Sequence, residues 1–193
     1  AAGMGTASRE ADPDVYDHAH AFCDVLVVGA GPAGLQAALT VARAGMEVWL
    51  VEQDCEPGGD LLNQNDAKLE KQRLELVAEL EQAGVRIMTR TTVFGLYDNG
   101  TAGLLERVTD HLSTTPVYLP RQRFWTLRAR HTIVASGAME RGVAFGNNDR
   151  PGIMNASAGR AYLNRYAVLG GEQIVVATNN DSAYQGAAEL AAA

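Results

Sequence analysis

One segment, from Cys23 to Gln53, limits the possible folds of this chain more than any other. It reads CDVLVVGAGPAGLQAALTVARAGMEVWLVEQ and places Gly29, Gly31 and Gly34 directly after the apolar run Val25–Val28. Such a run is typical of a strand that is covered on both faces in a parallel sheet. Glycines at this spacing, between a strand and a helix, indicate a loop that closes around a dinucleotide. The segment therefore predicts a Rossmann-like domain.

The residues after the glycines complete a βαβ unit. Helix-favouring residues extend over Gly34–Ala44, and Gly45 stands where a helix commonly ends in a left-handed residue. The run Glu47–Val51 predicts a second buried strand, which Glu52 ends with an acid. This full context makes the glycine motif much more specific than its spacing alone.

Each glycine has its own role in such a loop. Gly29 permits the tight turn, Gly31 lets a pyrophosphate approach the backbone, and Gly34 lets the helix pack against the strand. The N-terminus of the helix supplies N–H groups to the phosphates, and Glu52 is expected to accept hydrogen bonds from the adenosine ribose. An acid at this position favours NAD or FAD over NADP. The residues that we predict to bind the cofactor are Gly29, Ala30, Gly31, Pro32, Ala33, Gly34, Glu52, Gln53, Gly59, Ser136 and Gly137.

The rest of the chain predicts an α/β fold with an antiparallel part. Asp66–Ala83 has the apolar spacing of a helix, and Val85–Met88 is expected to be a third strand. Short alternating runs separated by turn residues then predict an antiparallel meander. The further strands that we expect are Thr92–Tyr97, Leu104–Thr109, Phe124–Ala129, His131–Ala138 and Gln173–Thr178.

Three parts follow from these patterns. Residues 1–22 are rich in small, charged and turn-forming residues, which predicts a flexible arm or linker. Residues 23–150 are expected to form a Rossmann-like FAD/NAD(P)-binding domain with a parallel sheet and an antiparallel β-meander. Residues 151–193 are expected to hold a connection and the truncated start of a second βα unit of the dinucleotide-binding type.

Composition excludes several classes of function. The 193 residues are 47% hydrophobic, so the chain can bury a sizeable core. A net charge of −7 with only 16 Lys and Arg residues argues against a nucleic-acid partner. No apolar run approaches the ~20 residues that span a bilayer, and no secretory signal pattern opens the sequence. We therefore expect a cytoplasmic protein without a membrane partner.

The residues that commonly carry chemistry give no catalytic pattern of their own. Cys23 and Cys55 match no metal motif and no disulfide framework, and we expect reduced thiols. None of the four histidines has a nucleophile or a metal-ligand partner at a recognisable spacing. The sequence predicts no catalytic residue and no metal site, so any redox chemistry would come from a cofactor.

A family resemblance extends over most of the chain. The glycine segment, together with IVASGAMERGVAFGNNDRPGIMNASAGRAYLNRY (Ile133–Tyr166) and VVATNNDSAY (Val175–Tyr184), resembles the α subunits of heterotetrameric sarcosine oxidases. Two positions depart from patterns common in related flavoproteins. Ser136 replaces a common threonine, and Asn179, Asn180 and Ser182 stand where a second glycine motif would be, which leaves a second nucleotide site in doubt.

The resemblance implies a cofactor set and a group of partners. In that family the dinucleotide domain of the α subunit holds NAD, while sarcosine is oxidised on FAD in the β subunit and a covalent FMN at the interface passes electrons to oxygen. The β, γ and δ subunits would be the partners. The reaction would convert sarcosine to glycine, hydrogen peroxide and methylene-tetrahydrofolate. This chain alone would be inactive.

Alternatives remain open for the cofactor and the enzyme. NAD and FAD place the same ADP moiety on the glycines and the acid, so FAD is the alternative cofactor. An FAD-dependent amino-acid or opine dehydrogenase subunit is the alternative enzyme. A disulfide reductase would favour a redox Cys-x-x-Cys motif, which is absent, and an interaction module with a vestigial motif would not bind a dinucleotide.

Replacement of Glu52 tests the predicted ribose contact. Charge-assisted hydrogen bonds contribute on the order of 1.5–3 kcal/mol, so Glu52→Ala in the full subunit should weaken dinucleotide binding roughly tenfold to a hundredfold. Glu52→Arg should weaken NAD binding further while easing that of a 2′-phosphate. Calorimetry measures both. Unchanged affinity for NAD and FAD in both Glu52→Ala and Gly31→Val would place the nucleotide elsewhere.

Overall fold

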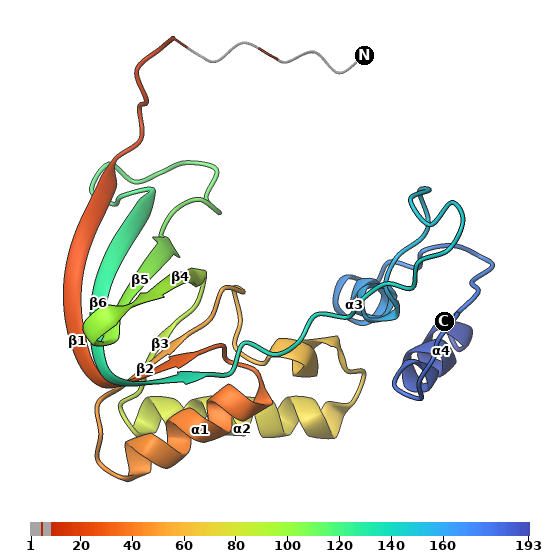
Figure 1. Ribbon diagram of the computed structural model, residues 1–193, viewed down its shortest axis with the longest axis horizontal. Helices are drawn as coiled ribbons and strands as arrows, with labels where there is room; N and C mark the ends of the chain where they lie inside the picture. Colours follow the sequence, from red (N-terminus) through yellow and green to blue (C-terminus); the bar gives the residue numbers. More distant parts are fainter. Residues whose placement is uncertain (1–4, 6–8) are drawn as a thin grey trace.

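A six-stranded sheet forms the centre of the molecule in the computed structural model, which describes Gly5 and residues 9–193 (Figure 1). The strand order is β3-β2-β1-β6-β5-β4. Neighbours are parallel from β3 to β6 and antiparallel from β6 to β4. The strands are β1 (Tyr16–Val28), β2 (Val48–Val51), β3 (Arg86–Met88), β4 (Thr91–Tyr97), β5 (Thr101–Arg107) and β6 (Gln122–Val134).

Helices cover one face of the parallel part. The helices α1 (Pro32–Arg43) and α2 (Ala67–Gln82) provide this cover. The chain also contains α3 (Ala156–Tyr166) and α4 (Ala183–Ala191), and the short 3₁₀ turns η1 (Gly59–Asn63) and η2 (Asp98–Gly100). α1 and α2 lie side by side beneath the sheet in Figure 1. Between them and the sheet is an apolar core that includes Val25, Val27, Leu35, Leu50 and Leu80. This burial explains the continuous apolar run that the sequence shows in β1.

The antiparallel strands build a second core on the other face. Leu26, Leu104 and Leu127 have no exposed surface, and they pack with the two tryptophans, Trp49 and Trp125. The indole rings meet edge to face with their centroids 5.4 Å apart, a favourable geometry for aromatic pairs. The predicted fold class, a Rossmann-like α/β domain with a parallel sheet and an antiparallel meander, is confirmed.

Local sequence signals set the helix boundaries. The carboxylate of Asp66 accepts hydrogen bonds from the N–H groups of Lys68 and Leu69 at 2.8 and 3.3 Å, which caps the N-terminus of α2. Gly45 and Gly84 have φ of +83° and +75° just beyond the ends of α1 and α2. The two helices therefore lie within two residues of their predicted bounds.

The N-terminal boundary differs from the expectation that residues 1–22 form an arm. β1 begins at Tyr16, and its first half pairs in parallel with β6 from Gln122 onward. An ion pair of 2.8 Å between Arg123 and Asp17 adds to the ladder, and Ala19 and Ala21 pack against the second core. Residues 1–4 and 6–8 of the predicted arm lie outside the described residues.

The strand predictions after residue 120 need two corrections. Phe124–Ala129 and the first part of His131–Ala138 belong to one strand, β6, because β1 pairs along the whole length of it. The run Gln173–Thr178 is not a strand. In the described part of the chain it has no pairing partner, and Val175 is 94% exposed. Apolar composition alone does not make a strand without a ladder to join.

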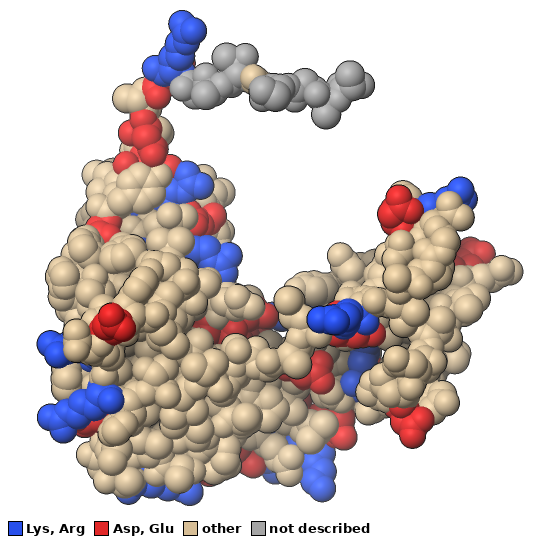
Figure 2. Space-filling view, in the orientation of Figure 1, with Lys and Arg blue, Asp and Glu red and all other residues tan. Residues whose placement is uncertain are grey.

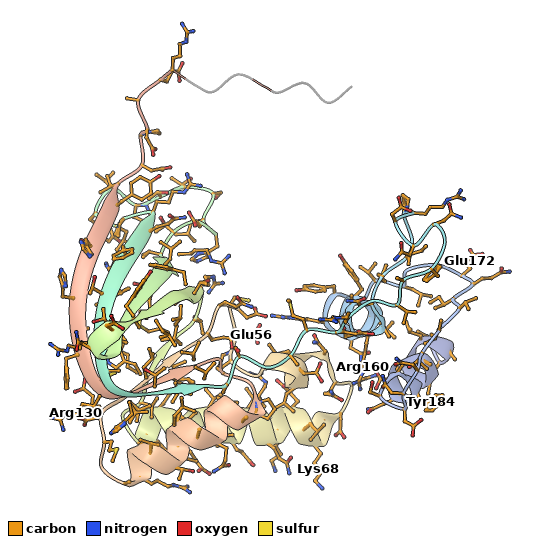
Figure 3. All side chains as sticks on the ribbon, viewed as in Figure 1. Glu56, Lys68, Arg130, Arg160, Glu172 and Tyr184 are labelled. Atoms are coloured by element: carbon orange, nitrogen blue, oxygen red, sulfur yellow. The ribbon has the colours of Figure 1, made fainter. Side chains whose placement is uncertain are left out.

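The helices α3 and α4 form a small unit beside the sheet (Figure 1). Arg160, labelled in Figure 3, extends from α3 toward α4 and forms an ion pair of 2.5 Å with Glu189. Figure 2 shows charged groups of both signs where this unit approaches the rest of the molecule, on a face that is mostly uncharged. Within the described residues, no helix has the length and apolar character that a membrane crossing requires.

The two cores make a direct prediction about stability. Leu26→Ala in the central strand should lower the free energy of unfolding by about 2–5 kcal/mol, because it leaves a cavity between β1, β5 and β6. Leu74→Ala on α2 is the matched control, because Leu74 is 53% exposed. Denaturant unfolding measures the difference. Equal effects of the two substitutions would contradict this assignment of the core.

Candidate functional site

The turn from β1 into α1 is so tight that neither Gly29 in the loop nor Gly34 in the first turn of α1 has room for a side chain. Gly29 has φ of +97°, and a Cβ there would lie 2.5 Å from the carbonyl oxygen of Ala135. A Cβ at Gly34 would lie 1.9 Å from the carbonyl oxygen of Gly29. These are the tight turn and the close helix packing that the glycine spacing predicts.

The middle glycine, Gly31, has a different environment. Its φ is −70°, which any residue can adopt, and a Cβ there would have no atom within 4 Å. Among the described residues no side chain caps the N-terminus of α1, so N–H groups of its first turn remain available. An anion at this place would gain those donors and the positive end of the helix dipole. The open backbone therefore fits a pyrophosphate.

The carboxylate of Glu52 lies directly beside this loop. It is 9% exposed and accepts a hydrogen bond of 2.7 Å from the N–H of Ala30 and one of 2.9 Å from the N–H of Asp54. Each oxygen thus holds one backbone donor and keeps further acceptor capacity. Glu52 fixes the end of β2 against the glycine loop, and its carboxylate could accept a further hydrogen bond from a ligand hydroxyl.

The glycine pair after β2 packs onto the same loop. The N–H of Gly58 donates to the carbonyl of Ala30 at 2.8 Å, and a Cβ at Gly59 would lie 2.9 Å from the Cα of Gly31. Both glycines have positive φ, +147° and +55°. The pair therefore forms a second wall beside Gly31, at a distance that only glycine permits.

A buried arginine holds this second wall, and sequence reasoning missed it. Arg73 of α2 is 5% exposed, and its guanidinium donates to the carbonyl of Pro57 at 2.7 Å. It also forms a bidentate pair with Glu70 at 2.7 and 2.6 Å, which lowers the pKa of that carboxyl. The aliphatic part of Arg73 lies against Gly58. The only signal in the sequence was the Glu70–Arg73 spacing of one helical turn, which is common on exposed helix faces.

The remaining predicted residues surround the loop less closely. The Cα of Ser136 lies near Gly29, 3.1 Å from where a Cβ would stand, and Gly137 has φ of +75° in an open position. Pro32 and Ala33 open α1 and are exposed, while Ala30 is buried. These positions gather where β1, β2 and β6 end. Gln53 is fixed through its backbone, because its carbonyl accepts a hydrogen bond of 2.6 Å from Arg107.

An ion pair joins Asp54, the residue after Gln53, to Arg165 of α3. Arg165 contacts both carboxylate oxygens of Asp54, at 2.6 and 2.8 Å. This pairing holds the pKa of Asp54 well below its usual range and raises that of Arg165. Beside it, the side-chain amide of Asn164 donates to the carbonyl of Asn63 at 2.9 Å. α3 is thereby attached to the segment that follows the predicted ribose acceptor.

Glu140 fixes the other end of α3. Its carboxylate accepts hydrogen bonds from the N–H groups of Ala156 and Ser157 at 3.2 and 2.8 Å, and from the hydroxyl of Ser157 at 2.5 Å. The Ser157 hydroxyl, followed by its N–H, lowers the pKa of Glu140. A carboxylate six residues beyond β6 thus caps a helix that has no cap on its own first residues.

Other candidates lie away from this loop. The ring of His18 lies tilted by 39° against that of His20 and meets Phe124 edge to face, with 4.8 Å between ring centroids in each pair. Cys23 is buried, and burial raises the pKa of its thiol to about 11, whereas Cys55 is exposed. No group of three or more His, Cys, Asp or Glu side chains in the described residues could hold a metal ion.

The chain matches a protein-family model over much of its length. The model is described as pyridine nucleotide-disulphide oxidoreductase, and it matches residues 23–174. This stretch contains the glycine loop, Glu52, the glycine pair and α3.

Individual relatives agree with this match. The α subunit of sarcosine oxidase from Rhizobium meliloti (strain 1021) is 46% identical over 198 aligned residues, covering 100% of this chain and 20% of that protein. The A-type subunit of opine oxidase from Rhizobium meliloti is 25% identical over 81% of this chain and 30% of that protein. L-proline dehydrogenase from P. horikoshii superposes with a TM-score of 0.66 and 25% identity, over 80% of this chain and 31% of that one.

These similarities confirm the resemblance that the sequence motifs indicate. The match to sarcosine oxidase α subunits extends over the whole chain, at nearly twice the identity of the match to opine oxidase. The chain spans about a fifth of the length of the α subunits that it matches. The chain therefore aligns with one part of each of these longer relatives.

Because the surroundings of Gly31 and Gly34 differ, we expect alanine to have different effects at the two positions. Gly31→Ala should leave the thermal unfolding temperature nearly unchanged, because its Cβ meets no atom. The same methyl should weaken dinucleotide binding at least roughly tenfold, because it fills the space where the backbone meets a pyrophosphate. Gly34→Ala is the comparison and should lower the unfolding temperature, because its Cβ overlaps the backbone. Calorimetry and thermal unfolding of the full subunit separate the two effects, and a binding loss only at Gly34 would contradict the assignment of Gly31 to the pyrophosphate.

Proposed function

This chain belongs to the pyridine nucleotide-disulphide oxidoreductase family, and we propose that it is the dinucleotide-binding part of a sarcosine oxidase α subunit. The proposal rests above all on the open backbone at Gly31, between the N-terminus of α1 and the Gly58–Gly59 wall. The whole-chain similarity to sarcosine oxidase α subunits supports the choice of enzyme.

Different residues of the loop would bind different groups in the ADP half of the nucleotide. The pyrophosphate would lie against Gly31, with donors from the first turn of α1. The ribose hydroxyls would donate to Glu52, whose oxygens are already oriented by Ala30 and Asp54. The roles of Pro32, Ala33, Gln53, Ser136 and Gly137 in lining the site belong to the same proposal.

NAD is the proposed cofactor, with FAD as the alternative. A nicotinamide or flavin ring supplies the hydride-accepting chemistry that the side chains of a protein lack. This chain would bind and orient the nucleotide through its ADP half. The sequence resemblance supports NAD on this subunit, while FAD and FMN are expected with the partner.

The enzyme as a whole would act on sarcosine. We propose β, γ and δ subunits as partners in a cytoplasmic hetero-oligomer that converts sarcosine to glycine, with hydrogen peroxide and methylene-tetrahydrofolate as further products. The proposed substrate follows the similarity to proteins named sarcosine oxidase. An opine oxidase component is the second candidate, because the A-type subunit of opine oxidase aligns over most of the chain at lower identity.

The identity of the nucleotide can be measured on the full-length α subunit. Nucleotide released by acid from the purified subunit should have the mass of NAD, and the subunit should lack the visible absorption of a flavin. Visible flavin absorption that is lost in Gly31→Val would instead support FAD at this site. Absence of any nucleotide, together with no binding of added NAD or FAD, would refute the proposed function.

The substrate needs a separate test on the assembled enzyme. Peroxide production should depend on sarcosine and not on an opine such as octopine. The isolated 193-residue chain should produce none, because no residue set in its sequence could accept a hydride without a cofactor. Opine-dependent peroxide production would favour the second candidate.

A further inference from the structure

The ribose end of the proposed site contains an arginine whose charge is already neutralised. Arg165 is 19% exposed at its side chain and is bound through two nitrogens to Asp54, which is 33% exposed. Asp54 is also the residue whose N–H binds the carboxylate of Glu52 at 2.9 Å. The guanidinium is therefore linked to the ribose acceptor through a single residue.

A planar guanidinium with two parallel donors can bind a phosphate as well as it binds a carboxylate. Discrimination against NADP commonly depends on whether an acid or an arginine meets the adenosine ribose. This site has both residue types, the acid Glu52 and the arginine Arg165, and the guanidinium of Arg165 is bound by the carboxylate of Asp54. We propose that Asp54 is a specificity-determining residue that occupies Arg165 and so excludes nucleotides carrying a 2′-phosphate. This inference rests on the proposed function, because it assigns the substrate class of the same site.

Other side chains keep α3 in place without Asp54. The amide of Asn164 binds the carbonyl of Asn63 at 2.9 Å, and Arg160 binds the side chain of Gln64 at 2.7 Å. Glu140 caps the first turn of α3. Loss of the carboxylate at Asp54 would therefore release the guanidinium while the helix that carries it remains attached.

The loop that carries Asp54 is also held independently of the ion pair. The N–H of Arg90 donates to the carbonyl of Asp54 at 2.7 Å, and Arg107 binds the carbonyl of Gln53 at 2.6 Å. The N–H of Cys55 binds the side chain of Asp54 at 2.6 Å, and an asparagine oxygen can accept the same bond. Asp54→Asn thus removes the charge with little reason for the loop to move.

The experiment uses the full-length subunit from which bound nucleotide has been removed. The two ligands contain the ADP part that NAD and FAD share. Calorimetry measures the dissociation constants of ADP-ribose and of 2′-phospho-ADP-ribose. Wild-type protein should bind ADP-ribose and discriminate strongly against its 2′-phosphate. In Asp54→Asn the ratio of the two constants should fall roughly tenfold or more, as expected for a new charge-assisted pair.

Two controls identify the cause. Asp54→Asn combined with Arg165→Gln should restore discrimination, because the freed guanidinium is removed. Asp110→Asn should leave the ratio unchanged, because Asp110 pairs with Arg121 near the start of β1, at the opposite end of the strand from the glycine loop. Thermal unfolding shows that each variant is folded.

The outcomes separate this inference from the proposed function. Wild-type binding of ADP-ribose with no change of ratio in folded Asp54→Asn overturns the role of Asp54 and leaves the proposed function intact. A change of ratio that persists in the double variant also overturns it, because Arg165 is then not the phosphate ligand. Wild-type protein that binds neither probe refutes both the proposed function and this inference.

Discussion

The close approach of three backbone segments organises this molecule. The end of β1, the start of α1 and the segment after β6 meet at Gly29, Gly34 and Ala135, so closely that a single Cβ would overlap a carbonyl oxygen. β6 pairs with β1 along its whole length up to this contact, although more than ninety residues separate the two strands in the sequence. A Cβ at the middle glycine, Gly31, would in contrast meet no atom within 4 Å. The open backbone at Gly31, to which we assign the pyrophosphate, lies between the two glycines that make this close contact.

Three arginine side chains help to hold the segment after β2 in place. Arg73 binds the carbonyl of Pro57, Arg107 that of Gln53, and Arg165 the side chain of Asp54. Each comes from a different element, α2, β5 or α3. A loop needs its backbone carbonyls satisfied, and guanidinium groups do this with directional donors. This explains how a loop with two left-handed glycines keeps a fixed position beside the helix N-terminus.

The parts of the fold that could be predicted from sequence are those with local signals. The glycine loop, the helix that starts near Asp66 and the apolar run of β1 are each indicated by residues within one short segment. The start of β1 could not be predicted, because its polar residues become a strand only by pairing with Gln122 and its successors. The run Gln173–Thr178 failed for the opposite reason, since its apolar residues have no described partner. At the site, Arg73 and Arg165 were missed because the loop residues that they bind, Pro57 and Asp54, are distant from them in the sequence.

The attachment of α3 differs in kind from that of α1 and α2. Both apolar cores consist of residues from the sheet, α1, α2 and their adjoining loops, and no described residue of α3 is buried. α3 is attached through the Glu140 cap, the Asn164 amide and the Arg165 pair. Hydrogen bonds of this kind contribute only about 0.5–3 kcal/mol each, but they require defined distances and directions. The position of α3 beside the proposed ribose site is therefore set by the directions of these hydrogen bonds rather than by burial. A single change of charge can therefore break or form an ion pair of a residue on α3 while both apolar cores stay intact.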